Sequence, residues 1–197
     1  MASKIVLASN NAGKLKEFQQ LLADQHLDVL PQAQFKVTEV DETGLSFVEN
    51  AIIKARHASK LSGLPAIADD SGLEVDFLDG APGIYSARFA GTDANDAKNN
   101  QQLLERLHGV PDEQRRARFQ CVLVYMRHPL DPTPLICQGT WEGRILQQAQ
   151  GSNGFGYDPL FLDPTTGLSS AELSKAEKNT RSHRAKALQC LLAQLSQ

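Results

Sequence analysis

Residues 4–14 read Lys-Ile-Val-Leu-Ala-Ser-Asn-Asn-Ala-Gly-Lys and predict a strand, a polar turn and the start of a helix. The apolar run at the start of this stretch is short and rich in β-branched residues, which is typical of a buried strand. The run Ser-Asn-Asn that follows it marks a turn. Residues 14–23 then carry apolar side chains at helical spacing, namely Leu15, Phe18 and Leu22. The chain is therefore expected to open with a strand–turn–helix unit.

The rest of the chain alternates between helical and strand patterns. Helices are expected at residues 47–61, 93–107 and 185–195, and strands at residues 65–68, 73–77, 119–127 and 135–146. The second of these helices is rich in Asn and Gln, and the last two strands suggest a long antiparallel hairpin or meander. This order predicts an α/β fold with a mixed central sheet flanked by helices. A single domain over residues 1–197, built of two lobes with a groove between them, is expected.

The composition argues against several classes of protein. The 197 residues hold 20 Lys and Arg against 23 Asp and Glu, and this net charge of −3 disfavours a general nucleic-acid coat protein. An apolar share of 41% is ordinary for a folded domain. The longest apolar stretch, residues 121–126, is too short to span a membrane, and the N-terminal residues lack the apolar core of a signal peptide. Three scattered cysteines form no metal-type pair, so a reducing compartment, the cytoplasm, is expected.

The turn Ser9-Asn-Asn-Ala-Gly-Lys14 is a candidate phosphate site. Between a strand and a helix, such a turn offers backbone N–H groups and a helix N-terminus to phosphate, and Lys14 supplies a counter-charge. It is not a Walker A loop, because it has one glycine and a different spacing to the lysine. An Asn/Gly turn that only caps the helix explains the same residues.

Acidic residues form a second candidate site. The run Asp-Asp-Ser-Gly at residues 69–72 is expected at the end of an apolar strand, and Glu42 precedes the helix at residues 47–61. Buried carboxylates need cations or hydrogen-bond donors, and oxygen ligands of this kind suit Mg²⁺. Adjacent residues of an extended chain point in opposite directions, so one of Asp69 and Asp70 should face a ligand and the other should hold the backbone. A solvated turn and an ordinary acidic helix N-terminus are the alternatives.

Two groups near the C-terminal end complete the set. The loop Gly-Phe-Gly-Tyr-Asp at residues 154–158 places aromatics between glycines, and an exposed ring there could stack on a flat base. Alternatively, Phe155 and Tyr157 only fill the core. Lys178 and the run Ser-His-Arg at residues 182–184 bring cationic donors just before the last helix, where a solvated charged face is the ordinary explanation.

The order of these motifs resembles the inosine triphosphate pyrophosphatase family, most of all its bacterial Ham1-like branch of noncanonical purine nucleotide pyrophosphatases. The matching motifs are Ser-Asn-Asn-Ala-Gly-Lys at 9–14, Glu42 with Phe-Val-Glu-Asn-Ala at 47–51, Ala-Asp-Asp-Ser-Gly at 68–72, Ala-Pro-Gly-Ile-Tyr-Ser-Ala-Arg at 81–88, Gly-Phe-Gly-Tyr-Asp at 154–158 and Ser-His-Arg at 182–184. The resemblance covers residue 4 to about residue 195, and no key position departs from the family's pattern.

This resemblance implies Mg²⁺-dependent hydrolysis of ITP, dITP or XTP to the nucleoside monophosphate and pyrophosphate, which cleanses the nucleotide pool. It also implies a homodimer, an active-site cleft between two lobes, and no stable nucleic-acid or membrane partner. Asp70 is implied to be the general base and, with Glu42, a Mg²⁺ ligand, and Lys14 is implied to act in catalysis. The implied substrate contacts are Ser9, Asn10, Asn11, Ala12, Gly13, Lys14, Ser71, Phe155, Gly156, Tyr157, Asp158, Lys178, His183 and Arg184. Asp69 and Glu49 are expected to support the site.

The implied contacts also give a physical reason for base selectivity. Hypoxanthine and xanthine carry a 6-keto acceptor where adenine carries a donor, so a pocket of donors that includes His183 and Arg184 favours the first two. Such a buried mismatch discriminates by roughly 10⁴-fold. Two other functions fit the same residues: a pyrophosphatase for pyrimidine or modified nucleotides, and a nucleotide-binding module without turnover. An RNA-binding protein is disfavoured by the net charge of −3.

Overall fold

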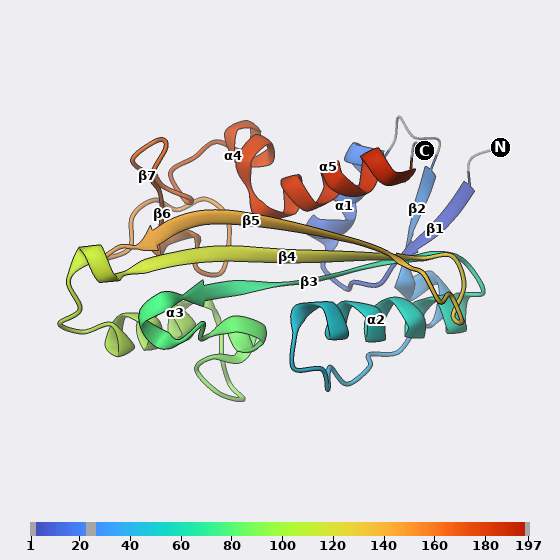
Figure 1. Cartoon of the computed structure of the whole chain (residues 1–197), viewed down its shortest axis with the longest axis horizontal. Coiled ribbons are helices and arrows are strands. Elements are labelled where there is room, and N and C mark those ends of the chain that lie inside the picture. The colour runs from blue at the N-terminus through green and yellow to red at the C-terminus, as the bar shows by residue number, and fades with distance from the viewer. Residues whose placement is uncertain (1–2, 23–26, 196–197) are drawn as a thin grey trace. The chain divides into compact units, whose positions relative to one another are not determined.

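The computed structural model of the chain describes residues 3–22 and 27–195, and Figure 1 shows its elements. The helices are α1 (Ala12–Leu22), α2 (Phe47–Ser62), α3 (Asp96–Arg106), α4 (Lys175–Arg181) and α5 (His183–Leu195). The strands are β1 (Ser3–Leu7), β2 (Leu27–Pro31), β3 (Ala66–Val75), β4 (Arg116–Met126), β5 (Leu135–Ile145), β6 (Phe161–Asp163) and β7 (Leu168–Ser169). Short 3-10 helices lie at Gln32–Phe35, Asp76–Leu78, Gly83–Arg88, Asp112–Gln114 and Asp158–Leu160.

The strands form one mixed sheet in the order β2-β1-β3-β4-β5-β6-β7. β1 is parallel to both β2 and β3, whereas β6 is antiparallel to both β5 and β7. Parallel pairing of β1 with β2 and β3 requires crossover connections, which α1 and α2 supply. The predicted α/β class with a mixed sheet and flanking helices is confirmed.

The chain divides into two compact units. Unit 1 comprises Met1–Asp70, Val122–Gln138 and Ala187–Gln197, and unit 2 comprises Ser71–Cys121 and Gly139–Lys186. Strands β3, β4 and β5 and helix α5 each contribute residues to both units. Each unit has its own cluster of buried apolar side chains.

The core of unit 1 forms where α2 packs on the sheet. Ser46 caps the start of α2 by accepting a hydrogen bond from the Glu49 N–H, and Gly63 ends the helix in the left-handed conformation at φ 69°. The buried apolar side chains of α2 are alanines (Ala51, Ala55 and Ala58), which pack against apolar residues of β1, β3 and β4. Small side chains let the helix approach the sheet closely. In Figure 1, α5 lies on the other side of β3 and β4 from α2.

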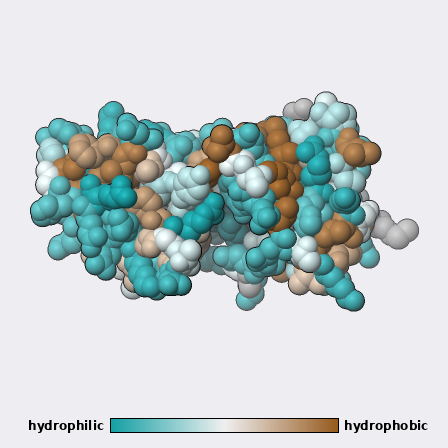
Figure 2. Space-filling view, turned by 90° about the horizontal axis from the view of Figure 1, so that it is seen from below, coloured by the Kyte–Doolittle hydropathy of each residue, from teal (hydrophilic) through white to brown (hydrophobic). Residues whose placement is uncertain are grey.

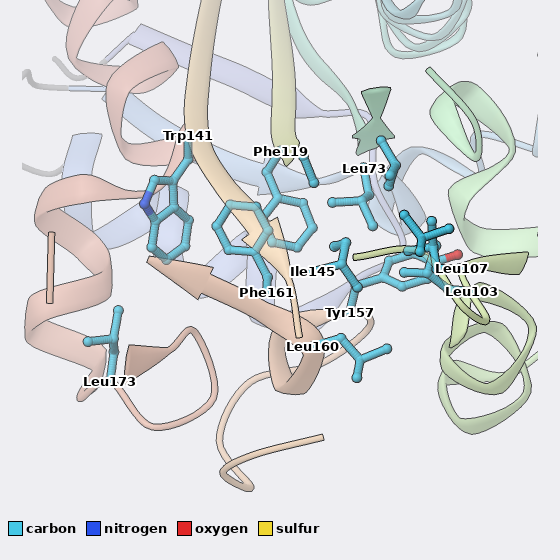
Figure 3. Close-up of a cluster of buried hydrophobic side chains, with 13 residues drawn as sticks. Leu73, Leu103, Leu107, Phe119, Trp141, Ile145, Tyr157, Leu160, Phe161 and Leu173 are labelled. Carbon is cyan, nitrogen blue, oxygen red and sulfur yellow. The ribbon is translucent and has the colours of Figure 1, made fainter. Parts of the chain in front are cut away.

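Aromatic rings dominate the core of unit 2 (Figure 3). Phe161 lies between Phe119 and Trp141, with ring centroids 4.4 Å and 5.1 Å away. Tilted rings at such distances contribute about 1 kcal/mol per pair beyond the burial of their area. Tyr157 and Leu160 extend this cluster toward the leucines of α3, so the loop before β6 is anchored in the core.

The sequence-based prediction was wrong for the segment that carries Asp69 and Asp70. Two strands were expected, at residues 65–68 and 73–77, separated by a turn. Instead, β3 runs without interruption over Ala66–Val75. Asp, Ser and Gly are common in turns, but here each aspartate meets a lysine from another element, so the strand continues through both carboxylates.

The other predicted elements lie close to their expected positions, whereas strands β2, β6 and β7 were not predicted. α1 begins at Ala12, and the residue at which its predicted range ends, Ala23, lies outside the described residues. α5 begins at His183 instead of residue 185, so His183 and Arg184 belong to its first turn and do not precede it. α4 was not predicted, although its capping box of Ser174 and Glu177 is a recognised start signal.

The face drawn in Figure 2 is largely hydrophilic, with apolar residues in separate patches. Exposed single apolar side chains are normal on folded proteins. Among the helices of the described residues, none combines the length and apolar character that crossing a membrane requires.

Candidate functional site

The predicted site residues fall into two groups, one in each unit. Unit 1 holds the turn at residues 9–14, Glu42, Asp69 and Asp70. Unit 2 holds the other predicted residues, which are Ser71, Phe155, Gly156, Tyr157, Asp158, Lys178, His183 and Arg184. The geometry within each group determines what it can bind.

A pocket of about 330 Å³ lies in unit 1, beyond the carboxyl end of β1. Ligand sites of α/β sheets form at this end of parallel strands, where the loops leave the sheet. The lining residues come from the β1–α1 turn, the segment before α2, α2 itself and β3. They are Ala8, Ser9, Asn10, Lys14, Gln32, Thr38, Glu39, Val40, Glu42, Lys54, His57 and Asp69.

The turn at residues 9–14 is ordered by its own side chains. Ser9 Oγ accepts a hydrogen bond from the Asn11 N–H at 3.1 Å. Asn11 Oδ1 accepts hydrogen bonds from the N–H groups of Gly13 at 2.9 Å and Lys14 at 3.0 Å. Asn11 therefore caps the first turn of α1, as the capping interpretation of this sequence expected. Ala12 is the first residue of that helix.

A further pair of hydrogen bonds holds Asn10. The buried Gln32 donates its Nε2 hydrogen to Asn10 Oδ1 at 2.7 Å, and Asn10 Nδ2 donates to Glu39 Oε1 at 3.1 Å. Gln32 and Glu39 are both well separated from the turn in the sequence. These bonds join the turn to the opposite wall of the pocket.

The two adjacent aspartates of β3 pair with lysines from different helices. Lys14 Nζ of α1 donates to Asp69 Oδ2 at 2.7 Å, and Lys54 Nζ of α2 donates to Asp70 Oδ1 at 2.9 Å. Because successive side chains of a strand point to opposite faces, the two carboxylates reach different helices. Lys54 Nζ also lies 3.3 Å from Glu42 Oε1, so it joins Glu42 to Asp70.

The carboxylates around Lys54, which are those of Asp70, Asp69 and Glu42, outnumber its single positive charge. Burial raises the pKa of Asp70, and although Lys54 opposes this rise, Glu42 and Asp69 reinforce it. Burial lowers the pKa of Lys54, but the attraction of Asp70, Asp69 and Glu42 outweighs burial, so its pKa lies above the ordinary value. Asp70 Oδ2 is buried and accepts no hydrogen bond from the residues that the structure describes. Such an oxygen is a vacant acceptor in a negatively charged site.

The loop at residues 154–158, the aromatic loop of unit 2, contains one aromatic residue that fits each interpretation of its sequence. Tyr157 is buried in the core and donates its hydroxyl hydrogen to the Ser86 carbonyl at 2.8 Å. Phe155 is 56% exposed, and Lys178 Nζ lies 5.5 Å from the centre of its ring. Phe155 is therefore available to a ligand, whereas Tyr157 fixes the loop.

Both carboxylate oxygens of Asp158 accept hydrogen bonds from other residues of the chain. Its Oδ1 accepts a hydrogen bond from Ser170 Oγ at 2.8 Å, and its Oδ2 accepts from the Phe155 N–H at 2.8 Å and from Lys178. A Cβ atom on Gly154 would collide with this carboxylate, so the turn requires glycine there. Asp158 shapes the loop and holds the Lys178 ammonium beside Phe155.

His183 and Arg184, in the first turn of α5, are both buried. The His183 ring stacks on Phe119, with centroids 4.8 Å apart and planes at 21°. Ser71, the first residue of unit 2, is half-buried on β3. Burial therefore restricts the His183 and Arg184 side chains, and stacking on Phe119 gives the His183 ring a defined orientation.

Sequence reasoning did not predict seven of the residues that line the unit 1 pocket, namely Ala8, Gln32, Thr38, Glu39, Val40, Lys54 and His57. Lys54 had a signal: it lies three residues after Ala51 and four before Ala58, which are both on the buried face of α2. A lysine on such a face needs a buried carboxylate as its partner. Gln32 had no such signal, because only the folded chain brings it to Asn10.

The α/β fold, with a polar pocket lined by lysines and carboxylates at the strand ends, is the arrangement in which such proteins bind their ligands. The chain belongs to the Ham1 family, whose profile matches residues 5–194.

Individual relatives agree with this assignment over nearly the whole chain. A dITP/XTP pyrophosphatase of Photobacterium profundum is 64% identical over 193 residues, covering 98% of both chains. A dITP/XTP pyrophosphatase of Escherichia coli O157:H7 is 59% identical over 189 residues, covering 96% of both. The structure of a Ham1 protein from Coxiella burnetii superposes with a TM-score of 0.95 at 51% identity, covering 98% of both chains.

Proposed function

We propose that this protein hydrolyses noncanonical purine nucleoside triphosphates, namely ITP, dITP and XTP, to the monophosphate and pyrophosphate, and so keeps deaminated purines out of DNA and RNA. Relatives about 60% identical over almost the full length carry the name dITP/XTP pyrophosphatase. The observation that carries the mechanism is the carboxylate of Asp70, which Lys54 holds by one oxygen while the other oxygen stays vacant.

Mg²⁺ is the proposed cofactor, and the residues present fit it. Asp70 Oδ2 is a buried acceptor without a partner in the described chain, and Glu42 presents a second carboxylate to the same lysine. Mg²⁺ binds through one or two carboxylates and substrate phosphate and keeps several waters, so it does not need a cage made entirely of protein. Asp70 and Glu42 would hold the ion, which when bound would neutralise charge on the phosphates.

The residues of unit 1 would handle the phosphate chain. Hydrolysis at the α-phosphorus depends mainly on positioning and on neutralising the charge of the departing pyrophosphate. Lys14, whose ammonium forms an ion pair with Asp69, would bind these phosphates. Lys54 would fix the orientation of the Asp70 carboxylate. Asp70, with its pKa raised by burial, would orient the attacking water and accept its proton.

The residues of unit 2 would recognise the base. The exposed Phe155 ring offers a stacking surface, and Lys178 is held against that ring by Asp158. His183 and Arg184 would donate hydrogen bonds to the 6-keto oxygen that ITP and XTP share. Adenine presents a donor at that position and would leave these groups unsatisfied.

The test is a panel of ITP, XTP, GTP and dTTP with analysis of the released phosphate. The expected result is pyrophosphate as first product, with ITP and XTP hydrolysed fastest and only when Mg²⁺ is present. Equal turnover of all four would contradict selection of the purine 6-keto group. Orthophosphate as first product would move the attack to another phosphorus. Binding of ITP with Mg²⁺ but without release of pyrophosphate would indicate a nucleotide-binding module instead of an enzyme.

We also propose a homodimer in the cytoplasm. The family resemblance supports the dimer, and the bacterial relatives with names from nucleotide metabolism support the compartment. Light scattering of the purified full-length protein measures the first directly, and a mass of one chain would contradict it. Fractionation of cells that express the chain measures the second.

A further inference from the structure

Two side chains on one side of helix α3 form hydrogen bonds with the aromatic loop of unit 2. Asp96 Oδ2 accepts a hydrogen bond from the Gly156 N–H at 2.7 Å, and Asn100 Nδ2 donates to the Gly156 carbonyl at 2.8 Å. Asp96 and Asn100 are four residues apart, so they lie on the same side of the helix. Both backbone polar groups of a single loop residue are therefore satisfied by two adjacent side chains of α3.

We propose that Asp96 and Asn100 are positioning residues for base selectivity: they fix Gly156 and thereby aim the exposed ring of Phe155 at the substrate's base. This inference rests on the proposed function and extends it to a helix that supplies no direct substrate contact in that proposal.

The backbone is fixed on both sides of Phe155, which is what makes its ring orientation specific. On one side, the Phe155 N–H donates to the buried Asp158 carboxylate. On the other side, Gly156 is held by α3, and Tyr157 is anchored in the core by its ring and its hydroxyl. Gly156 adopts the left-handed conformation at φ 61°, which the loop needs in order to present both its N–H and its carbonyl to α3.

Fixing the loop matters because Phe155 itself has little side-chain packing to hold it. The ring is 56% exposed, and the Lys178 ammonium lies 5.5 Å from its centre. Unless its backbone is held, an exposed ring loses conformational freedom when a base stacks on it, and this loss opposes binding. Hydrogen bonds to Gly156 restrict the ring before the substrate arrives, so they strengthen the binding of the base without touching it.

Variants that keep the size of the side chain distinguish a role in positioning Phe155 from a role in folding alone. Asn100→Asp keeps the size of the side chain but replaces the N–H donor with an acceptor that faces the Gly156 carbonyl. Asp96→Asn keeps an oxygen that can still accept from the Gly156 N–H and serves as the conservative rescue. Gln101→Ala, at an exposed neighbour whose side chain donates to Glu105 of the same helix, is the matched control.

The experiment compares two probes that bind opposite ends of the proposed substrate. Full-length wild type and variants are titrated with inosine monophosphate and, separately, with inorganic tripolyphosphate, and KM and kcat for ITP are measured beside thermal stability. Loss of one such hydrogen bond is worth about a five- to tenfold change in affinity. Asn100→Asp should bind inosine monophosphate about tenfold more weakly and raise KM for ITP, with tripolyphosphate affinity and kcat almost unchanged. Gln101→Ala should stay within about twofold of wild type, and Asp96→Asn, which keeps a neutral acceptor in place of a charged one, should weaken the binding of inosine monophosphate less than Asn100→Asp does.

Each outcome decides between the possibilities. Equal weakening of both probes would mean that α3 only maintains the fold, and unchanged inosine monophosphate affinity in a folded Asn100→Asp would mean that the Gly156 contacts do not aim Phe155. Either result overturns the inference while the wild type still prefers ITP. A wild type that hydrolyses no purine triphosphate removes the proposed function first, and the inference with it. If Asn100→Asp does not fold, Asn100→Ala, which leaves no repelling acceptor, replaces it in the same comparison.

Discussion

Asp70 is the residue on which the chemistry of unit 1 depends. It is buried, its Oδ1 is held by Lys54 at 2.9 Å, and its Oδ2 has no partner among the described residues. A carboxylate with one oxygen fixed and the other vacant is oriented and still offers an acceptor to a ligand. Asp69, its neighbour in sequence, differs because its Oδ2 is held by Lys14 at 2.7 Å, on the opposite face of the strand.

Asp70→Asn should abolish most turnover without unfolding the protein. An amide oxygen of the same shape still accepts from Lys54, but it cannot take a proton from water, and loss of a general base costs about 10²–10⁴-fold in kcat. The measurement is the rate of pyrophosphate release from ITP, with far-UV circular dichroism to verify the fold. Asp79→Asn, the same exchange at an exposed turn residue, is the control and should keep the wild-type rate. A kcat for Asp70→Asn within tenfold of wild type would exclude Asp70 as the base.

Lys14→Ala should affect both the substrate and the fold. Its ammonium is expected to contact phosphates in the ground and transition states, so KM should rise and kcat should fall, together about 10–100-fold in kcat/KM. Asp69 would also lose the lysine that binds its buried Oδ2, so the free energy of unfolding should fall by roughly 1–3 kcal/mol. Lys16→Ala, at an exposed position of the same helix, should change neither quantity. An unchanged KM in Lys14→Ala would argue against the phosphate contact.

At the scale of an element, the carboxylate of Asp131 organises the connection between β4 and β5. Asp131 accepts hydrogen bonds from the Arg127 N–H at 3.0 Å, from Arg127 Nε at 2.8 Å and from the Thr133 N–H at 3.1 Å. These bonds, above all those from the Arg127 side chain, hold the pKa of Asp131 well below its ordinary range. The turn is therefore built around an ionised aspartate.

The stability that Asp131 supplies should disappear in acid. Its folded-state pKa is below the unfolded value of about 3.9, so the stabilisation is complete above that pH and is lost as the pH falls toward the folded pKa. Asp131→Asn should melt below wild type at pH 7, and the difference in melting temperature should shrink steadily below about pH 4. Asp28→Asn, an exposed residue of β2, should show no such pH-dependent difference. A difference that stays constant down to about pH 2.5 would show that the carboxylate's ionisation is not the cause.

The accuracy of the sequence predictions for each element follows the physics of that element. Helix α2 was predictable because its alanines repeat at helical spacing between a Ser cap and a Gly stop. β3 was not, because the neutralising partners Lys14 and Lys54 lie far from it in sequence, and without them Asp-Asp-Ser-Gly indicates a turn. The sequence could predict a site residue where its chemical type is unusual for the element in which it is expected. Gln32, an ordinary polar residue, could be recognised only from its contact with Asn10.

At the scale of the whole molecule, two separate cores share three continuous strands. The aromatic core of unit 2 and the alanine-rich core of unit 1 have no residue in common, but β3, β4 and β5 contribute to both units. A break in the hydrogen bonding of one strand therefore affects the register in both units. We expect the units to unfold together in spite of their separate cores.

Phe161→Ala tests this cooperativity. Removing this fully buried ring should cost about 3–5 kcal/mol of unfolding free energy. Fluorescence of Trp141, the single tryptophan, reports unit 2, and far-UV circular dichroism reports the whole chain. Both midpoints should fall by the same amount in the variant. A fluorescence midpoint clearly below the dichroism midpoint would show that unit 2 melts by itself. Phe77→Ala, at a half-exposed position, should lower stability by less than about 1 kcal/mol.

The pairing of neighbouring aspartates with different helices also limits how β3 can change over evolutionary time. Deleting one residue from Ala66–Ala68 would move every later side chain of the strand to the reverse side of the pleat, so that Asp69 and Asp70 would each face the helix that the other one faces now. Substitutions can accumulate in this strand one at a time, but a frame slip of a single position would misplace Asp69 and Asp70 simultaneously. Length variation among descendants of this chain should therefore concentrate in its connecting loops, such as residues 127–134, and spare β3.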